Sequence, residues 1–229
     1  CTSTPNSFLN LLSAKYNIPL AINEKGGGIG PDWNFAYNVS NTQYVTLAHQ
    51  DDLYAPNYIE VCLTMARGNA DNLIVFTDYS EIINSNTESH RLMLYVKRLL
   101  LWPYKFNLSL RSKFWKRLIV SFGNPISCPS VMYNKPNLKD FAFFENMKTN
   151  MDWLAWLTLS KMKGSIVCVP QRLTYHRIHP DSETSNTINN NARKLEDYYI
   201  FEQIWGKLIA GFLMKFYSFS YKSNFSKIK

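Results

Sequence analysis

The sequence predicts an α/β fold in which a mostly parallel sheet is covered by helices. Helix-like and strand-like segments alternate from residue 6 to residue 79, which is the order expected for such a sheet. In addition, 46% of the 229 residues are hydrophobic and only 18% are charged, so the chain can bury a substantial core.

The first elements follow the order helix, strand, helix, strand, helix, strand. Apolar residues at helical spacing identify the helices, and the second of them opens with Pro31, a residue suited to a helix start. Short apolar runs identify the strands, and a glycine-containing loop over 24–30 separates the first strand from the second helix. The expected ranges are 6–16, 31–40 and 56–69 for the helices and 18–22, 43–48 and 72–79 for the strands.

The second half of the chain is less regular. A helical, basic and aromatic segment is followed by a proline-containing loop, a helix closed by Gly164, two short strands and a polar run that reads as a linker. The tail has the pattern of a basic amphipathic helix. We therefore expect one domain over 1–185, and a linker with a basic amphipathic helical tail over 186–229. The ranges are 91–122, 123–136, 150–164, 165–170, 172–177 and 179–194, with the tail from Leu195 to Lys229.

The net charge and the cysteine content limit which classes of function the protein can have. The chain has 25 Lys and Arg against 17 Asp and Glu, a net charge of +8, which favours nucleic acid, anionic lipid or phosphorylated substrates as partners. Cys1, Cys62, Cys128 and Cys168 are far apart and form no CxxC pair, so neither a zinc site nor a disulfide framework is indicated. No signal peptide and no run of roughly 18 apolar residues is found. Because the chain begins with Cys, we expect a fragment whose first elements are missing.

The stretch YVTLAHQDDLYAP, residues 44–56, holds the first candidate site. Asp51 and Asp52 follow an apolar strand, and in α/β sheets ligands bind beyond the carboxyl ends of the strands. Magnesium or manganese is commonly held by one or two carboxylates while substrate phosphates supply other ligands, and His49 could add a nitrogen ligand. The alternative is a solvated turn in which an aspartate caps the next helix.

Asp152 is the second candidate. It lies in the first turn of the helix over 150–164, where an acid usually complements the helix dipole or caps the helix. Its apolar neighbours, which include Trp153 and Trp156, would raise its basicity. A carboxylate of that kind could accept a proton from a sugar hydroxyl.

The remaining motifs are weaker. His176 and His179 could both face a metal or a diphosphate, although such a pair after a strand is more often a hydrogen-bonded structural feature. The GGGIG loop lacks the Gly-Lys-Ser/Thr of a P-loop, so its plain interpretation is a loop that needs positive φ. The basic, aromatic segment over 91–122 could suggest RNA, but its helical spacing favours core packing, and no nucleic-acid motif is found.

Taken together, four stretches resemble a family 2 glycosyltransferase of the A-type fold (GT-A, a Rossmann-like fold), of the bacterial surface-polysaccharide kind. They occur in the family's order and together span most of residues 20–210; the first is the most specific. These are NEKGGGIGPDWNFAYNVSNTQYVTLAHQDDLYAPNYIE, NMDWLAWLTLSKMKG, RLTYHRIHPDSET and ARKLEDYYIFEQIWGKLI.

The resemblance assigns roles to individual residues. Asp51 would contact the divalent cation, Mn²⁺ or Mg²⁺, that bridges the donor's diphosphate, with Asp52 and His49 beside it. The family often has an acid where His49 stands. Asp152 would deprotonate the acceptor hydroxyl in an inverting transfer. The positions implied for donor binding are Gly27, Gly28, Asn34 and Gln50, and those implied for the diphosphate or a lid are His176 and His179.

The implied function is transfer of a sugar from a nucleotide-sugar donor to a saccharide or lipid-linked acceptor in surface-polysaccharide biosynthesis. The catalytic domain would be N-terminally incomplete, since the family begins with a strand, a helix and a strand that hold the base, and donor binding by this chain would then be impaired.

The expected location is the cytoplasm, peripheral on the inner face of the membrane, where the tail would lie on anionic lipid or else pack on the domain. The alternative is a non-catalytic sugar- or membrane-binding module, and nucleic acid is not an expected partner.

Overall fold

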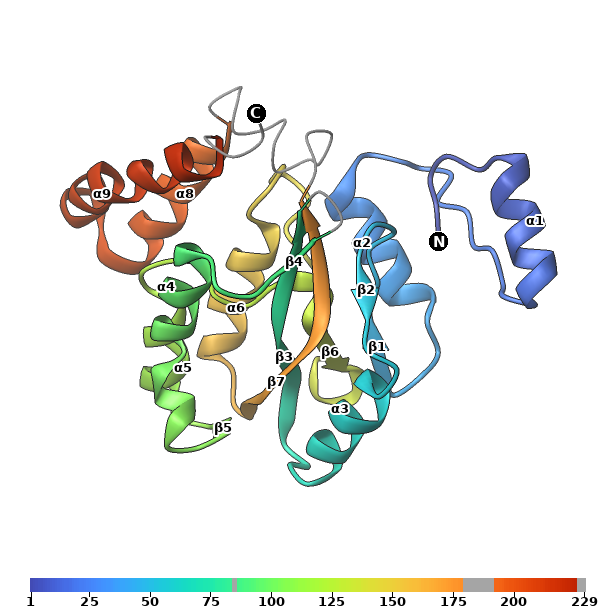
Figure 1. The fold of residues 1–229 in the computed structure, drawn as a ribbon, viewed down its shortest axis with the longest axis horizontal. Coiled ribbons are helices and arrows are strands. Elements are labelled where there is room, and N and C mark those ends of the chain that lie inside the picture. Colours follow the sequence, from blue (N-terminus) through green and yellow to red (C-terminus); the bar gives the residue numbers. More distant parts are fainter. Residues whose placement is uncertain (84–85, 179–191, 226–229) are drawn as a thin grey trace.

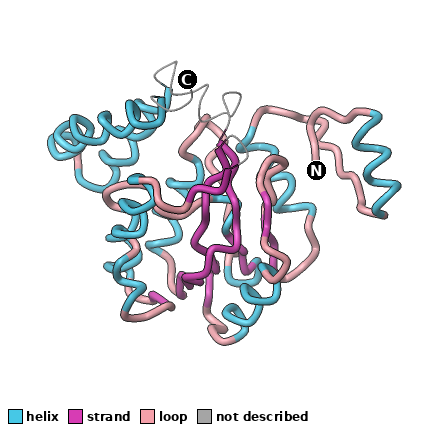
Figure 2. The backbone as a smooth tube through the Cα atoms, in the orientation of Figure 1, coloured by secondary structure: helices cyan, strands magenta, loops and turns pink. Residues whose placement is uncertain are grey.

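The computed structural model describes residues 1–83, 86–178 and 192–225, with side chains described as far as residue 217. A sheet forms the centre of the molecule and helices flank it (Figure 1). The helices α4, α5, α8 and α9 lie on the left in this view, whereas α1 and α2 lie on the right. Figure 2 shows the same arrangement with the strands in magenta between helices in cyan.

Five strands form the main sheet, in the order β1-β6-β3-β7-β2. The longest pairing joins β3 and β7, which are parallel. Because β6 is antiparallel to both β1 and β3, β1 runs in the same direction as β3 and β7. The predicted α/β fold is therefore confirmed, with a parallel core inside a mixed sheet. The bounds are β1 Tyr44–Thr46, β2 Leu53–Tyr54, β3 Asn72–Ile83, β6 Val131–Asn134 and β7 Ser165–Ile178, and two short antiparallel strands, β4 Asn86–Glu88 and β5 Ser109–Leu110, pair with β3 and β7.

Helices cover both faces of the sheet. On one face α3 packs Tyr58 and Cys62 against Val75 and Val167. On the other face the largest buried side chains come from α6, where the Trp156 ring stacks on Tyr133 of β6 at 6.1 Å. The α-helices are α1 Ser7–Tyr16, α2 Ile29–Val39, α3 Tyr58–Arg67, α4 Leu92–Leu100, α5 Lys113–Val120, α6 Met151–Lys161, α8 Ala192–Trp205 and α9 Lys207–Phe225, and three 3₁₀ turns are η1 Trp102–Lys105, η2 Cys128–Ser130 and η3 Lys135–Asn137.

A glycine makes the tight connection from α6 to β7. Gly164 has φ of +108°, and a Cβ atom there would lie 2.6 Å from the carbonyl oxygen of Asp71. Only glycine therefore fits at this turn, as its place at the end of the predicted helix suggests. The close approach brings β7 alongside the start of β3.

Four predicted elements differ in the structure. Residues 18–22 are not a strand, because they pair only through a single bridge between Thr2 and Ile22 and because Pro19 has no amide hydrogen. The two strands expected over 165–170 and 172–177 are one strand, β7, whose register to β3 shifts between Thr77 and Asp78. The loop expected over 123–136 contains β6.

The basic segment over 91–122 and the tail over 195–229 are also divided more finely than predicted. The first contains α4, η1, β5 and α5 in succession. The second is two helices joined at Gly206, whose φ is +76°, and α8 already begins at Ala192. The predicted domain boundary, between residues 185 and 186, falls outside the described residues.

The tail helices pack on the domain. Ile200 and Phe201 of α8 are buried, and the indole nitrogen of Trp205 donates to the carbonyl of Ser121 at 2.8 Å. The second prediction for the tail is that it packs on the domain. This is what α8 and the buried side of α9 do. Among the described residues, no helix is both long enough and apolar enough to cross a membrane.

Candidate functional site

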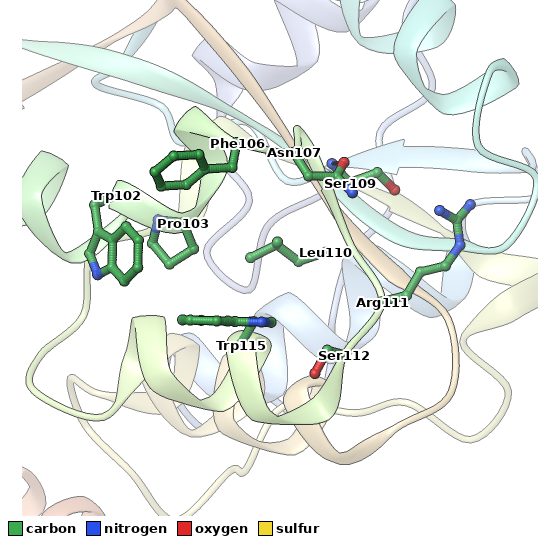
Figure 3. A pocket seen from close by; sticks show the side chains of 9 residues that line it. All are labelled: Trp102, Pro103, Phe106, Asn107, Ser109, Leu110, Arg111, Ser112 and Trp115. Carbon is green, nitrogen blue, oxygen red and sulfur yellow. Dashed lines mark hydrogen bonds between the residues drawn. The ribbon is translucent and has the colours of Figure 1, made fainter.

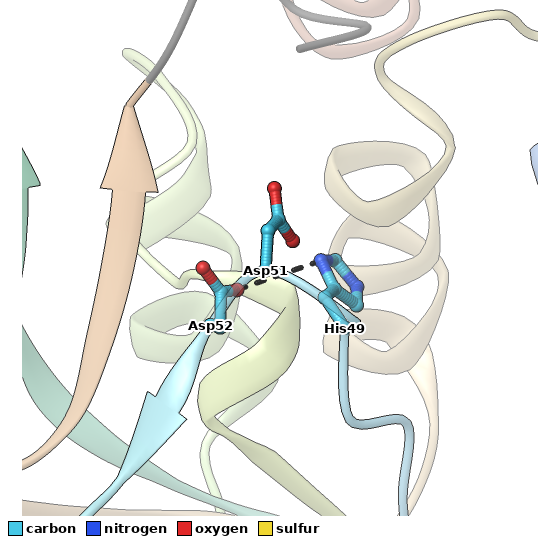
Figure 4. A group of neighbouring side chains, drawn as sticks. All are labelled: His49, Asp51 and Asp52. Atoms are coloured by element: carbon cyan, nitrogen blue, oxygen red, sulfur yellow. Dashed lines mark ion pairs between the residues drawn. The ribbon is translucent and has the colours of Figure 1, made fainter. Parts of the chain in front are cut away.

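Three side chains converge in the turn that follows β1 (Figure 4). His49, Asp51 and Asp52 each offer one metal-ligand atom, and these atoms lie within 4.8 Å of one another. The turn is closed by the amide of Asp52, which donates to the carbonyl of His49 at 3.4 Å. The residues selected from the sequence as a metal site are thus brought together by one short loop at the carboxyl end of β1.

Asp52 is the buried member of this group, with a fully covered side chain. Its Oδ1 accepts the backbone N–H of Arg177 at 2.8 Å and lies 3.0 Å from Nδ1 of His176. Burial alone would raise the pKa of Asp52, but the hydrogen bond and charge of His176 and the Arg177 amide outweigh it and hold the pKa below its ordinary value. Asp52 is therefore an ionised carboxylate that fastens the turn to the end of β7.

His49 has the properties of a neutral ligand. Its ring stacks on Trp33 with centroids 5.1 Å apart, and its Nδ1 lies 3.7 Å from Oδ2 of Asp52. Burial lowers the pKa of His49, although the charge of Asp52 opposes this shift, and only neutral imidazole binds a metal. Its Nε2 is buried and has no hydrogen-bond partner in the described part of the chain.

Asp51 lies between the other two and its carboxylate points away from the ribbon (Figure 4). The backbone oxygen of Asp51 accepts a hydrogen bond from Nε of Arg177 at 3.0 Å. Together with the contacts of Asp52, this bond holds the backbone of the turn. A set of one carboxylate and one imidazole, held in place by the second carboxylate, fits a divalent cation. Manganese suits it better than magnesium, because magnesium prefers oxygen ligands throughout.

Asp152 occupies the first turn of α6, as predicted. Its Oδ2 accepts from the side-chain amide of Asn124 at 2.7 Å, and its Oδ1 accepts from the amide of Trp153 at 2.7 Å. Burial raises the pKa of Asp152, and these hydrogen bonds, with the charges of Arg193 and Lys97, only partly offset it. A carboxylate with raised proton affinity is suited to accept a proton.

The charges of both acidic positions act on one buried thiol. Burial raises the pKa of the Cys128 thiol, and the negative charges of both Asp152 and Asp52 raise it further. Cys128 in η2 thus lies within electrostatic reach of the metal turn and of the first turn of α6.

The positions expected to bind the donor lie in different settings. Gly27 and Gly28 precede α2 with φ of +111° and +97°, which confirms that this loop needs positive φ. Gln50 is exposed in the metal turn. Asn34 is buried, and its side chain pairs with the backbone N–H and carbonyl of Phe143 at 2.7 and 2.9 Å, so it holds the segment before α6. Roles in donor binding for these four positions stay predictions.

Of the closing histidines, His176 contacts the metal turn, whereas His179 lies outside the described residues. Sequence reasoning missed three residues that shape the site. Arg177 belongs to the same closing motif as His176, and Trp33 precedes Asn34. Both residues therefore stand next to a position that the sequence had already indicated. Asn124 had none, because its contact with Asp152 depends on how α5 and α6 pack.

No protein-family model matches the chain. The chain is similar to an uncharacterized glycosyltransferase of Rickettsia typhi, with 28% identity over 194 residues. The match covers 84% of this chain and 54% of the Rickettsia protein, so the chain spans about half the length of the curated relative it matches.

Proposed function

We propose that the protein is a metal-dependent glycosyltransferase of family 2 and the A-type fold, which moves a sugar from a nucleotide-sugar donor to a saccharide or lipid-linked acceptor. The observation that carries this proposal is the cluster of His49, Asp51 and Asp52 at the carboxyl end of β1. The similarity to a glycosyltransferase supports the same reaction class. Surface-polysaccharide biosynthesis on the inner face of the membrane is the setting we propose for it.

Asp51 and His49 would hold a Mn²⁺ or Mg²⁺ ion, while Asp52 keeps the turn in place. When bound, the cation supplies charge neutralisation for the diphosphate that leaves the sugar. The contribution of the protein is a rigid turn, fixed to β7 through the contacts of Asp52 with His176 and Arg177. A fixed ligand set costs no reorganisation during the reaction.

Asp152 would act as the base. It would accept the proton of the acceptor hydroxyl as the hydroxyl oxygen attacks the anomeric carbon and the bond to the diphosphate breaks. Attack from the face opposite the leaving group inverts the anomeric configuration. Asn124 and the Trp153 amide orient the carboxylate, and burial raises its proton affinity.

A second candidate function is a non-catalytic sugar- or membrane-binding module with the same fold. The internal contacts of Asp52 favour this alternative, since His176 and Arg177 already occupy its carboxylate. In that case the turn has only a structural role, and Asp152 is a buried residue in the first turn of α6. The two functions differ in whether a sugar nucleotide is turned over.

The test is release of nucleoside diphosphate from a panel of sugar nucleotides, with Mn²⁺ and then with a chelator. We expect Mn²⁺-dependent turnover, and a loss of at least about 100-fold in Asp51→Ala and in Asp152→Asn. The matched control is Asp140→Asn, because Asp140 is exposed and asparagine tolerates its positive φ of +59°. Activity that survives both substitutions overturns the site, whereas donor binding without turnover identifies a binding module.

A further inference from the structure

The surface formed by α4, η1 and α5, which we call the α4–α5 face, exposes an unusual number of large apolar side chains. Phe106, Leu99 and Phe114 are 81%, 68% and 67% exposed, and Trp102 and Trp115 are each more than a third exposed. Ring contacts join the four aromatic side chains into one patch, since Trp102 meets Phe106 and Trp115, and Trp115 meets Phe114. A contiguous apolar patch of this kind marks a contact with a partner or a membrane.

The aromatic side chains of the α4–α5 face are ordered against one another. The Trp102 ring meets Trp115 edge-on at 5.5 Å and meets Phe106 at 5.7 Å. Between them opens a pocket of about 510 Å³, lined by these three rings and by Leu110 (Figure 3). The α4–α5 face therefore contains a pocket with an aromatic rim.

Ser109 in the wall of this pocket provides a separate observation. It is only 7% exposed, and its Oγ has no hydrogen-bond partner among the residues that the structure describes. A buried hydroxyl without a partner costs free energy. Leu110 points toward the rings of the pocket, whereas the Ser109 hydroxyl lies on the other side of the strand (Figure 3).

The charge around the α4–α5 face is positive. The sequence contains no aspartate or glutamate between Ser89 and Lys139. Lys105 and Lys113 are exposed beside the aromatic rim. Arg111 also lines the pocket but forms a two-point ion pair with Asp71, at 2.8 and 2.9 Å. The exposed lysines at the rim therefore match an anionic surface.

We propose that the α4–α5 face docks on an anionic phospholipid membrane. Trp and Phe side chains favour the boundary between headgroups and acyl chains, and lysines reach from apolar surroundings to phosphates. A second copy of the chain fits less well, because it would bring two positive patches together.

The surface continues toward the tail. Figure 1 places α8 and α9 on the same side as α4 and α5, and Phe122 after α5 packs on Trp205 at 5.2 Å. Leu208 of α9 is 92% exposed and Phe212 is also exposed. Membrane contact is thus assigned to the domain itself, with α9 at its margin. This inference does not depend on the proposed glycosyl transfer.

Co-sedimentation with vesicles tests the proposal. The wild-type protein should bind vesicles of phosphatidylglycerol and phosphatidylcholine but bind phosphatidylcholine alone poorly. The double variant Phe106→Ser/Phe114→Ser should lose at least about tenfold in partitioning. The control is Phe8→Ser/Leu11→Ser on α1, at the opposite end of the molecule, where both side chains are similarly exposed. Circular dichroism checks that all variants are folded.

A second pair of variants tests the charge. Lys105→Gln/Lys113→Gln should weaken binding to anionic vesicles by about fivefold for each lysine. The exposed lysines 15 and 25 provide the control Lys15→Gln/Lys25→Gln, which should bind as the wild type does. Equal losses in the two pairs would contradict a specific role for the rim.

Three results overturn the proposal. The first is a wild-type protein that does not bind anionic vesicles. The second is a Phe106→Ser/Phe114→Ser variant that binds like its control while Leu208→Ser/Phe212→Ser loses binding, because the tail alone would then be the anchor. The third is a wild-type dimer that Phe106→Ser/Phe114→Ser converts to a monomer, because the face would then be covered by a second copy.

Discussion

The carboxylate of Asp52 lies 3.0 Å from Nδ1 of His176, although 124 residues separate the two in the sequence. The next residue, Arg177, donates its backbone N–H to the same oxygen at 2.8 Å. Beside this contact β2 pairs with β7, with Leu53 opposite Tyr175. The acidic turn after β1 and the closing YHR motif are therefore one structure.

Adjacent aspartates should have different effects on stability. Asp52→Ala should lower the free energy of unfolding by about 2–3 kcal/mol, because it leaves the Arg177 amide and the His176 ring without their charged acceptor. Asp51→Ala should cost less than about 1 kcal/mol, since its side chain is partly exposed. Urea denaturation of both variants measures the difference. Equal losses would mean that Asp52 is not the structural member of the pair.

The stabilisation by Asp52 should depend on pH. Because the pKa of Asp52 is lowered in the folded state, its contribution is present above the ordinary value of 3.8 and is lost as pH falls through the folded-state value. The difference in unfolding free energy between wild type and Asp52→Asn should therefore be present above pH 3.8 and shrink below it. A difference that stays constant down to pH 2 would contradict the lowered pKa.

Asn124 should set the pH dependence of turnover. Its hydrogen bond lowers the pKa of Asp152 against the larger, raising effect of burial, so Asn124→Ala should raise this pKa further. A base is active only when deprotonated, and the acid limb of kcat/KM should accordingly move to higher pH. The pH profile of diphosphate release measures the shift. Asn124→Asp is not a suitable control because it adds a charge, whereas Ser127→Ala, in the same loop, should leave the limb unchanged.

Gly164 should tolerate no side chain. In Gly164→Ala the new Cβ would meet the carbonyl of Asp71 at 2.6 Å with φ at +108°, so a loss of about 2–4 kcal/mol in unfolding free energy is expected. Gly211→Ala in α9 is the matched control, because nothing lies within 4 Å of its Cβ position and alanine favours a helix. Its stability should rise or stay the same. Thermal unfolding of the two variants distinguishes a close contact from a general effect of glycine.

Much of the fold could be predicted because its strands and helices carry clear periodic patterns. The apolar run at residues 43–48 ends at the acidic turn, and this local pattern was enough to place Asp51 and Asp52 at the sheet edge. The strand β6 was missed because four residues between Pro129 and Pro136 show no period, and only its pairing with β1 and β3 makes it a strand. Likewise, β7 continues past Pro170 because it pairs with β3 on both sides of that residue.

The partners of the site residues could not be predicted in the same way. The contact of Asn124 with Asp152 joins segments 28 residues apart, and that of Asn34 with Phe143 joins segments 109 apart. Such contacts follow from how helices pack on the sheet, which depends on the summed shape of many side chains. Residue type alone therefore identified the acids but not what holds them.

The most direct measurement is the affinity for Mn²⁺, by electron paramagnetic resonance, with and without a nucleoside diphosphate. Wild-type protein should bind Mn²⁺ more tightly when the diphosphate is present, because phosphate oxygens complete the ligand set. Asp51→Ala should weaken binding at least about tenfold, whereas Asp140→Asn should not change it. Equal affinities in wild type and Asp51→Ala would contradict a metal and diphosphate site in the turn after β1.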